Sequence, residues 1–251
     1  MDVSRICLWS GPRNISTALM YSFAQRSDTR VVDEPLYGHY LRVSGVEHPG
    51  RKEVLAAMET DGEKVVREVV LGPADRPVLF MKQMAHHLVK LDRDFLSRTV
   101  NILLIRNPRD VLMSLVHQIP QPRLADTGIG MQSELYDELR SLGQDPPVVD
   151  SRELLLDPRA VLVELLGRLG LPFEEAMLAW PPGVRPEDGV WAPHWYANVH
   201  RSTGFAPYRP RTSPFPGHLS TLLEECIPHY ERLLEVAIRA AETTGGTEHD
   251  A

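Results

Sequence analysis

Residues 6–20 read ICLWSGPRNISTALM, and this stretch decides the fold. Its apolar start predicts a short buried strand, residues 10–14 predict a tight turn, and residues 15–20 predict the first turns of a helix. Gly11 permits the sharp turn, and the free N–H groups of the turn and helix start face one point, where the helix dipole adds positive potential. The stretch therefore predicts a binding site for a phosphate-like anion.

The side chains of this loop fit the same anion. Arg13 offers a two-pronged donor, and Ser16 and Thr17 offer hydroxyl groups from the first helical turn. An ordinary Gly-Pro turn before a capped helix is the alternative interpretation. Asn14-Ile15 stands where a Walker A loop has Gly-Lys, and the missing lysine argues against ATP hydrolysis.

Composition limits the classes of function. The chain has 251 residues and a formal net charge of -7, which argues against general binding of nucleic acid or anionic membranes. Two cysteines give no disulfide framework, and we expect both to be buried free thiols. We find neither a bilayer-spanning apolar stretch nor a signal-peptide pattern. These features predict a cytoplasmic enzyme that acts on a small molecule.

The next two predicted strands bring polar residues to the same sheet edge. Residues 29–32 form a second strand, which ends at Glu34, and residues 77–82 form a third, which ends at Lys82. Glu34 is a candidate for chemistry, with a solvated loop acid as the alternative. His86 and His87 follow on a predicted helix, where at most one faces the site, and we expect His87 on the surface.

The fourth strand, residues 100–105, is a nearly continuous apolar run of the kind buried on both faces. Arg106 follows it, and Asn107 is a suitable N-cap for a helix with Pro108 in its first position. Arg106 lies at the predicted strand tip and Ser114 lies two turns into the predicted helix, so both side chains can bind the same ligand group. A surface salt bridge and a small packing residue are the alternatives for these two.

The remaining segments complete an α/β prediction. Residues 47–76 indicate an inserted helical layer, 118–131 a mobile loop with a helix from 133 to 142, 147–150 a fifth strand, 151–169 a long amphipathic helix, 181–217 a long irregular segment, and 218–242 a helix kinked at Pro228. We therefore predict one domain, residues 1–242, with a central, mostly parallel sheet flanked by helices, similar to P-loop NTPases. Residues 243–251 are predicted to be a flexible tail.

Three segments in this order resemble the sulfotransferases that use 3′-phosphoadenosine-5′-phosphosulfate (PAPS). Residues 11–17 resemble the family's 5′-phosphosulfate loop, although Asn14-Ile15 replaces the usual Ser-Gly. Residues 106–110 with Ser114 resemble the 3′-phosphate motif. Residues 153–158 and 170–172 are similar to the family's downstream helix.

The resemblance implies PAPS as co-substrate, 3′,5′-adenosine bisphosphate (PAP) as product, and no metal. The implied phosphosulfate ligands are Gly11, Pro12, Arg13, Asn14, Ile15, Ser16 and Thr17. Arg106 and Ser114 become the 3′-phosphate clamp, and Arg201, Ser202 and Gly204 correspond loosely to a late nucleotide-binding segment.

The resemblance also frames the chemistry, which is sulfuryl transfer to a hydroxyl or amine of a small acceptor. Arg13 and Lys82 are expected to stabilise the transferring group and the leaving oxygen. Glu34 is the expected base, with His86 as the second candidate or as an acceptor-binding residue. A P-loop small-molecule kinase and a non-catalytic nucleotide-binding domain are the alternative functions.

Overall fold

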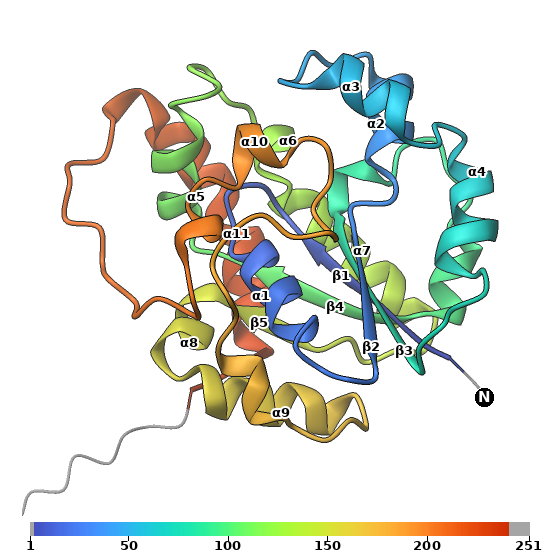
Figure 1. Ribbon diagram of the computed structural model, residues 1–251. Coiled ribbons are helices and arrows are strands. Elements are labelled where there is room, and N and C mark those ends of the chain that lie inside the picture. The colour runs from blue at the N-terminus through green and yellow to red at the C-terminus, as the bar shows by residue number, and fades with distance from the viewer. Residues whose placement is uncertain (1–2, 241–251) are drawn as a thin grey trace, which may run out of the picture.

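A six-stranded parallel sheet in the order β2-β3-β1-β4-β5-β6 lies at the centre of the chain (Figure 1). The structure is a computed structural model that describes residues 3–240, so the predicted tail, residues 243–251, lies outside it. The strands are β1 (Ser4–Ser10), β2 (Thr29–Asp33), β3 (Val78–Met84), β4 (Val100–Ile105), β5 (Val148–Asp150) and β6 (Ala237–Ile238). The first five were predicted from sequence.

Strand register gathers the predicted site residues at one edge. Leu8 of β1 pairs with Lys82 of β3 on one side and with Ile102 of β4 on the other. The carboxyl ends of these three parallel strands therefore lie together, where open α/β sheets place their ligands. This register brings the loop after β1, the tip of β3 and Arg106 after β4 to a common place.

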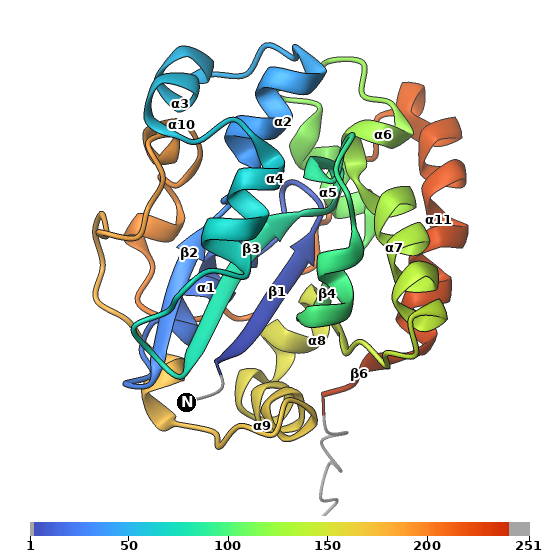
Figure 2. The ribbon, with the colours of Figure 1, turned by 90° about the vertical axis from the view of Figure 1, so that its right-hand side faces the viewer.

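Helices cover both faces of the sheet. They are α1 (Ser16–Phe23), α2 (Tyr37–Ser44), α3 (Arg51–Ala57), α4 (Gly62–Val65), α5 (Pro108–Leu115), α6 (Leu124–Thr127), α7 (Ile129–Ser141), α8 (Ser151–Leu156), α9 (Pro158–Arg168), α10 (Ala192–Trp195) and α11 (Ser220–Glu235). A π-helical turn, Val66–Val70, continues α4, and short 3-10 turns include Ala85–His87 and Asp94–Arg98. Helices α1, α8 and α9 pack on one face, and α4, α7 and α11 on the other (Figures 1 and 2).

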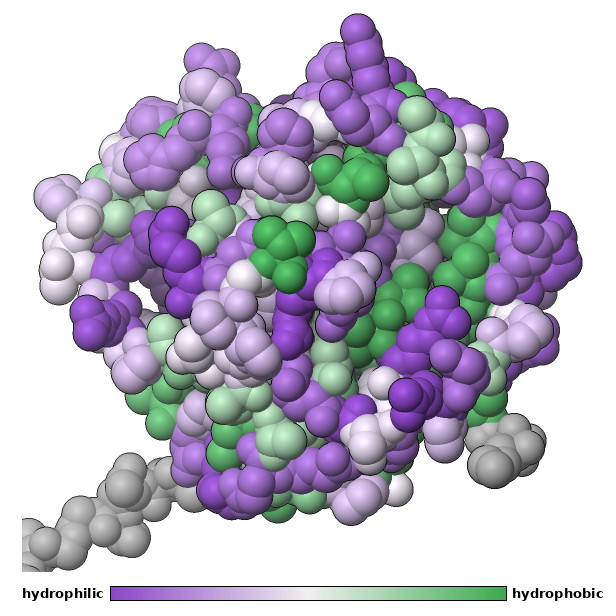
Figure 3. Space-filling model, in the orientation of Figure 1, coloured by the Kyte–Doolittle hydropathy of each residue, from purple (hydrophilic) through white to green (hydrophobic). Residues whose placement is uncertain are grey.

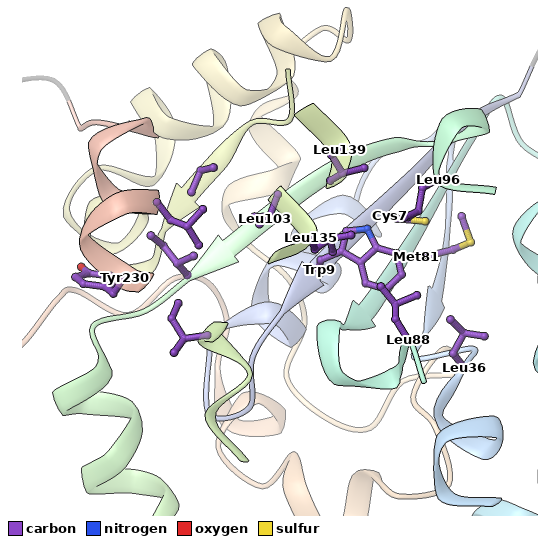
Figure 4. Packing of buried hydrophobic residues seen from close by; sticks show 14 of the residues in the cluster. Cys7, Trp9, Leu36, Met81, Leu88, Leu96, Leu103, Leu135, Leu139 and Tyr230 are labelled. Atoms are coloured by element: carbon purple, nitrogen blue, oxygen red, sulfur yellow. The ribbon is translucent and has the colours of Figure 1, made fainter. Parts of the chain in front are cut away.

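Alternation along the strands divides the core into two layers. Cys7 and Trp9 of β1 point to the layer under α7 and α11, whereas Ile6 and Leu8 point to the layer under α1 and α9. The indole of Trp9 lies among the first group (Figure 4), and its N–H donates to Asn101 Oδ1 at 2.8 Å. Both cysteines are buried free thiols, as predicted.

The structure corrects three element predictions. The segment 118–131 is not a loop throughout, because it contains α6 and the start of α7. The helix predicted over 151–169 is interrupted at Asp157, whose side chain caps α9 by accepting from the Ala160 amide at 2.9 Å. The last helix contains Pro228 as predicted but ends at Glu235, and the chain then forms β6, a two-residue strand that was missed.

A third, smaller apolar cluster lies above the carboxyl edge of the sheet. It joins residues of α2 and α3 to Trp191 and Tyr196, and thus brings the irregular segment after residue 181 over the ends of β2 and β3. The face shown in Figure 3 is mostly hydrophilic, with its apolar surface gathered in patches. No helix within residues 3–240 combines the length and apolarity needed to cross a bilayer.

Candidate active site

The loop between β1 and α1 holds an unusual backbone conformation at Arg13. Its φ of 57° is left-handed, which costs a residue with a Cβ about 1–2 kcal/mol. Arg106 stabilises this turn, since its guanidinium donates to the Arg13 carbonyl at 2.8 Å. The predicted anion loop and the predicted strand-tip arginine are therefore one assembly.

Two guanidinium groups converge here, and neither has an ion-pair partner among the described residues. Arg13 Nε donates to Ser114 Oγ at 2.8 Å, which links the loop to α5. Arg13 and Arg106 are both half-buried, and neither forms an ion pair within residues 3–240. Burial lowers the pKa of both groups, and the positive charge of Arg211 lowers both further. Asp110 opposes the shift at Arg106 without cancelling it. Charges left uncompensated in this way favour the binding of an anion.

The amino end of α1 adds free donors to the same place. The N-cap position, Ile15, contributes no side-chain cap, and the first turn has no acidic residue. Ser16 and Thr17 are buried, and their hydroxyls donate no hydrogen bond within the described residues. A helix start left open in this manner is suited to phosphate-like groups.

Gly11 allows the loop to lie against the segment before α7. A Cβ at Gly11 would come within 2.5 Å of the Thr127 carbonyl oxygen, so any side chain here would displace the loop. Gln132 of α7 supports the loop from below by donating to the carbonyls of Trp9 and Leu104 at 3.1 and 2.9 Å. Sequence reasoning missed this contribution, because Thr127 lies in the segment interpreted as a mobile loop and Gln132 lies between that loop and the next predicted helix.

Asn14 fixes the conformation of the loop at the position where the resemblance gives Ser-Gly. Its Nδ2 donates to the Leu104 carbonyl at 2.8 Å, and its Oδ1 accepts from the Ile15 amide at 2.8 Å and from the Ser151 hydroxyl. The Asn14 side chain thus fixes a turn at the place where the resembling loops have the flexible residue glycine. Asn14 supports the loop and uses its own polar atoms in doing so.

Lys82 lies in a buried polar cluster at the tip of β3. Its ammonium donates to Asp33 Oδ1 at 2.9 Å, Glu34 Oε1 at 2.5 Å and the Tyr196 hydroxyl at 2.7 Å. Burial opposes the charged form of Lys82, but the two carboxylates outweigh it and raise its pKa. All three protons of the ammonium are therefore used, and contact with a transferring sulfuryl group would require one of these bonds to break.

Glu34 has one oxygen held and one oxygen free. Its φ of 41° is left-handed, and its Oε1 is bound to Lys82. Oε2 lies 3.9 Å from His87 Nε2 and accepts no hydrogen bond from any residue the structure describes. Burial raises the pKa of Glu34, and the Lys82 ammonium opposes the shift without cancelling it. These properties suit a proton acceptor.

Asp33 is the second carboxylate that pairs with Lys82. Besides the hydrogen bond from Lys82, Asp33 accepts hydrogen bonds from the Tyr196 hydroxyl at 2.8 Å and from the Gly189 amide at 3.3 Å. Trp191 in turn donates to the Tyr196 hydroxyl at 3.1 Å. The segment after residue 181 thus contributes to the cluster, and Tyr196 belongs to the support of the site.

The two histidines after β3 are placed differently from expectation. His87 is not on the surface: it is 1% exposed and stacks against the rings of Tyr37 and Tyr40 of α2. That helix was not predicted, which explains the error. His86 lies on the loop side, since its Nδ1 is 3.9 Å from the place a Cβ on Gly128 would take. Burial lowers the pKa of His86 to about 4.

The late nucleotide-binding segment makes its contacts elsewhere in this structure. Ser202 accepts from the Trp180 indole at 3.0 Å, Gly204 pairs with Ala179, and Arg201 donates to Asn198 Oδ1 at 2.7 Å. None of these contacts reaches the loop of Arg13, so the nucleotide-binding role of Arg201, Ser202 and Gly204 stays a prediction.

Arg211 is a basic residue of the site that sequence reasoning missed. It lies close enough to lower the pKa of both Arg13 and Arg106, and its Nε is 3.8 Å from Asp110 Oδ1 at the start of α5. Its segment is fastened by Arg109, which donates to the Ser213 carbonyl at 3.2 Å. No local pattern marks Arg211, because it lies in irregular chain far from the motif it joins.

The family model of the sulfotransferase domain matches residues 4–237, which include the whole of this site. The chain belongs to the sulfotransferase domain family. Two solved sulfotransferase domains share the fold of this domain, at 16% identity each. One, from the curacin biosynthetic pathway, has a TM-score of 0.54 and covers 89% of this chain and 97% of its own; the other, from the Synechococcus PCC 7002 olefin synthase, has 0.51, 90% and 95%.

Two curated relatives of this sulfotransferase domain come from Arabidopsis thaliana. They are named branched-chain-amino-acid aminotransferase-like proteins 2 and 1, and they are 42% and 43% identical over 226 residues. The match covers 90% of this chain but 40% of each relative. The sulfotransferase domain described here therefore spans less than half the length of these relatives.

Proposed function

We propose that this domain moves the sulfuryl group of PAPS to a hydroxyl or amine of a small-molecule acceptor. The observation that carries the proposal is the pair of half-buried guanidiniums, Arg13 and Arg106, which form no ion pair within residues 3–240 and lie beside an uncapped helix start. Two such groups, with the Ser114 hydroxyl between loop and helix, fit a nucleotide that bears phosphate at two positions.

The residues of this chain divide the work of the reaction. PAPS, when bound, supplies the activated sulfuryl group. Arg13, Ser16, Thr17 and the loop amides would hold its 5′-phosphosulfate, and Arg106 and Ser114, with Arg211 nearby, would hold its 3′-phosphate. These preorganised donors would stabilise charge that develops on the departing phosphate oxygen.

Glu34 would take the proton of the acceptor through its free oxygen, Oε2. Lys82 keeps Oε1 in place, and burial, with the nearby Asp33 carboxylate, leaves Glu34 with a raised pKa. Lys82 is thus proposed mainly as the residue that positions Glu34. His86, which lies between Gly128 and His87, is proposed to contact the acceptor.

Calorimetric titration with PAP and with ATP, with and without Mg²⁺, tests the proposal. We expect tight, Mg²⁺-independent binding of PAP, which falls about tenfold to more than a hundredfold in Arg106→Ala, because a hydrogen bond to a charged group is worth about 1.5–3 kcal/mol. Arg98→Ala is the matched control, since this exposed arginine precedes β4 and therefore lies at the opposite end of that strand from Arg106. Preference for Mg-ATP with an indifferent Arg106 would reject the proposal and favour a kinase.

A further inference from the structure

A cavity of about 200 Å³ lies between the chain after β3 and helix α7, which run side by side (Figure 2). Its walls are polar and apolar in nearly equal parts, and its polar members are His86, Arg93 and Glu134. The other lining residues are Ala85, Leu88, Val89, Met131 and Leu135. A volume of this size equals that of about seven water molecules in the liquid, so any ligand it takes is small.

His86 connects this cavity to the anion site. It lines the cavity, and its Nδ1 also lies beside Gly128, where a Cβ would be 3.1 Å from the Cα of Gly11. Nδ1 is buried and has no hydrogen-bond partner within the described residues. The His86 end of the cavity therefore lies next to the loop of residues 11–17, and a ligand hydroxyl at this end would lie beside that loop.

The charged residues of the cavity indicate which charge the far end of a ligand would carry. Arg93 is already occupied, because it donates to Glu138 Oε2 at 2.8 Å and to the Leu88 carbonyl at 2.9 Å. Glu134, on the exposed side of α7, forms no ion pair within residues 3–240. The charge left open to a ligand is therefore negative, which favours a positive group and opposes a carboxylate.

We infer that this cavity binds the acceptor, and that the acceptor is a small alcohol or phenol with an apolar body and an amine at its far end. The hydroxyl would lie at His86, the body against Met131 and Leu135, and the amine toward Glu134. The inference rests on the proposed sulfuryl transfer and narrows its acceptor from small molecules in general to cationic hydroxyl compounds.

Calorimetry on the full chain with PAP added tests the inference with three probes of one shape: tyramine, tyrosol and 4-hydroxyphenylacetate. We expect tyramine to bind best and 4-hydroxyphenylacetate least. Glu134→Gln should weaken tyramine about two- to fivefold, the value of an exposed ion pair, and leave tyrosol unchanged. Glu164→Gln, on α9, is the control for loss of one charge. Met131→Trp, which fills the cavity, should weaken tyramine and tyrosol at least tenfold.

Equal binding of the three probes, or equal effects of Glu134→Gln and Glu164→Gln, would overturn the choice of a cationic acceptor. Unchanged tyramine binding in Met131→Trp would overturn the cavity itself. PAP affinity is measured on each variant in parallel. Retained PAP binding with no probe bound would reject this inference alone, whereas absent PAP binding in the unmodified chain would reject the sulfotransferase proposal.

Discussion

The site has two basic parts, a lysine half formed by Lys82 and an arginine half formed by Arg13 and Arg106, and they differ in what surrounds their charges. Lys82 is buried, and its ammonium group donates one hydrogen bond each to Asp33, Glu34 and Tyr196. Arg13 and Arg106 are half-buried and form no ion pair within the described residues. A charge compensated inside the protein supports the structure around it, whereas an uncompensated charge at the surface attracts a ligand. This difference supports the proposal that Lys82 positions Glu34 and that Arg13 and Arg106 bind the nucleotide.

Removing Lys82 gives the largest effect expected from this difference. Lys82→Met leaves the carboxylates of Asp33 and Glu34 buried without their cation, which should lower the free energy of unfolding by about 3–5 kcal/mol. Lys64→Met is the control, because the exposed Lys64–Glu59 pair should contribute no more than about 1 kcal/mol. Urea unfolding of both variants measures the two values. Equal losses of unfolding free energy in the two variants would show that the buried Lys82 cluster stabilises the fold no more than an exposed ion pair does.

His86 lies between the two halves and gives a smaller effect that depends on pH. Its pKa is lowered from 6.5 to about 4 in the folded chain, so the unfolded chain binds more protons between these values. The free energy of unfolding should therefore fall as pH decreases from 6.5 to 4. His86→Gln should flatten this part of the curve, whereas exposed His218→Gln should not. An unchanged slope in His86→Gln would place the proton uptake on other groups.

Arg211 gives the smallest expected effect and probes the edge of the arginine half. Its side chain is exposed and lies near Asp110, so part of its charge is compensated. Arg211→Ala should weaken PAP up to about fivefold, less than Arg106→Ala, because exposed charge pairs contribute about 0.2–1 kcal/mol. Arg209→Ala, two residues away and also exposed, is the control. If Arg211→Ala lowers PAP affinity as much as Arg106→Ala does, the solvent exposure of an arginine does not determine how much it contributes to PAP binding.

Sequence patterns predicted the elements whose signal is local. The strand, turn and helix of residues 6–20 carry period and glycine signals within a few residues, and the Asn107–Pro108 helix start is confirmed by the Asn107 cap on the Arg109 amide at 3.0 Å. Two strand residues at Ala237–Ile238 offer no such period, so β6 was missed.

The rest of the site depends on contacts between distant segments. His87 is buried because α2 lies over it, and Tyr196 and Arg211 reach the site from irregular chain that carries no period. Neither fact can be read from the neighbours of these residues. Tertiary contact alone also decides that Lys82 is surrounded by acids while Arg13 is not.

The contacts of Asn14 also set when the anion site can form. They join residue 14 to Leu104 and Ser151, which are 90 and 137 positions away in the chain. Closing such long loops is entropically costly and slow relative to local structure. A growing chain therefore cannot complete the loop of residues 11–17 until β4 and α8 are in place. If this loop binds PAP as proposed, the appearance of PAP binding during refolding would report a late stage of folding.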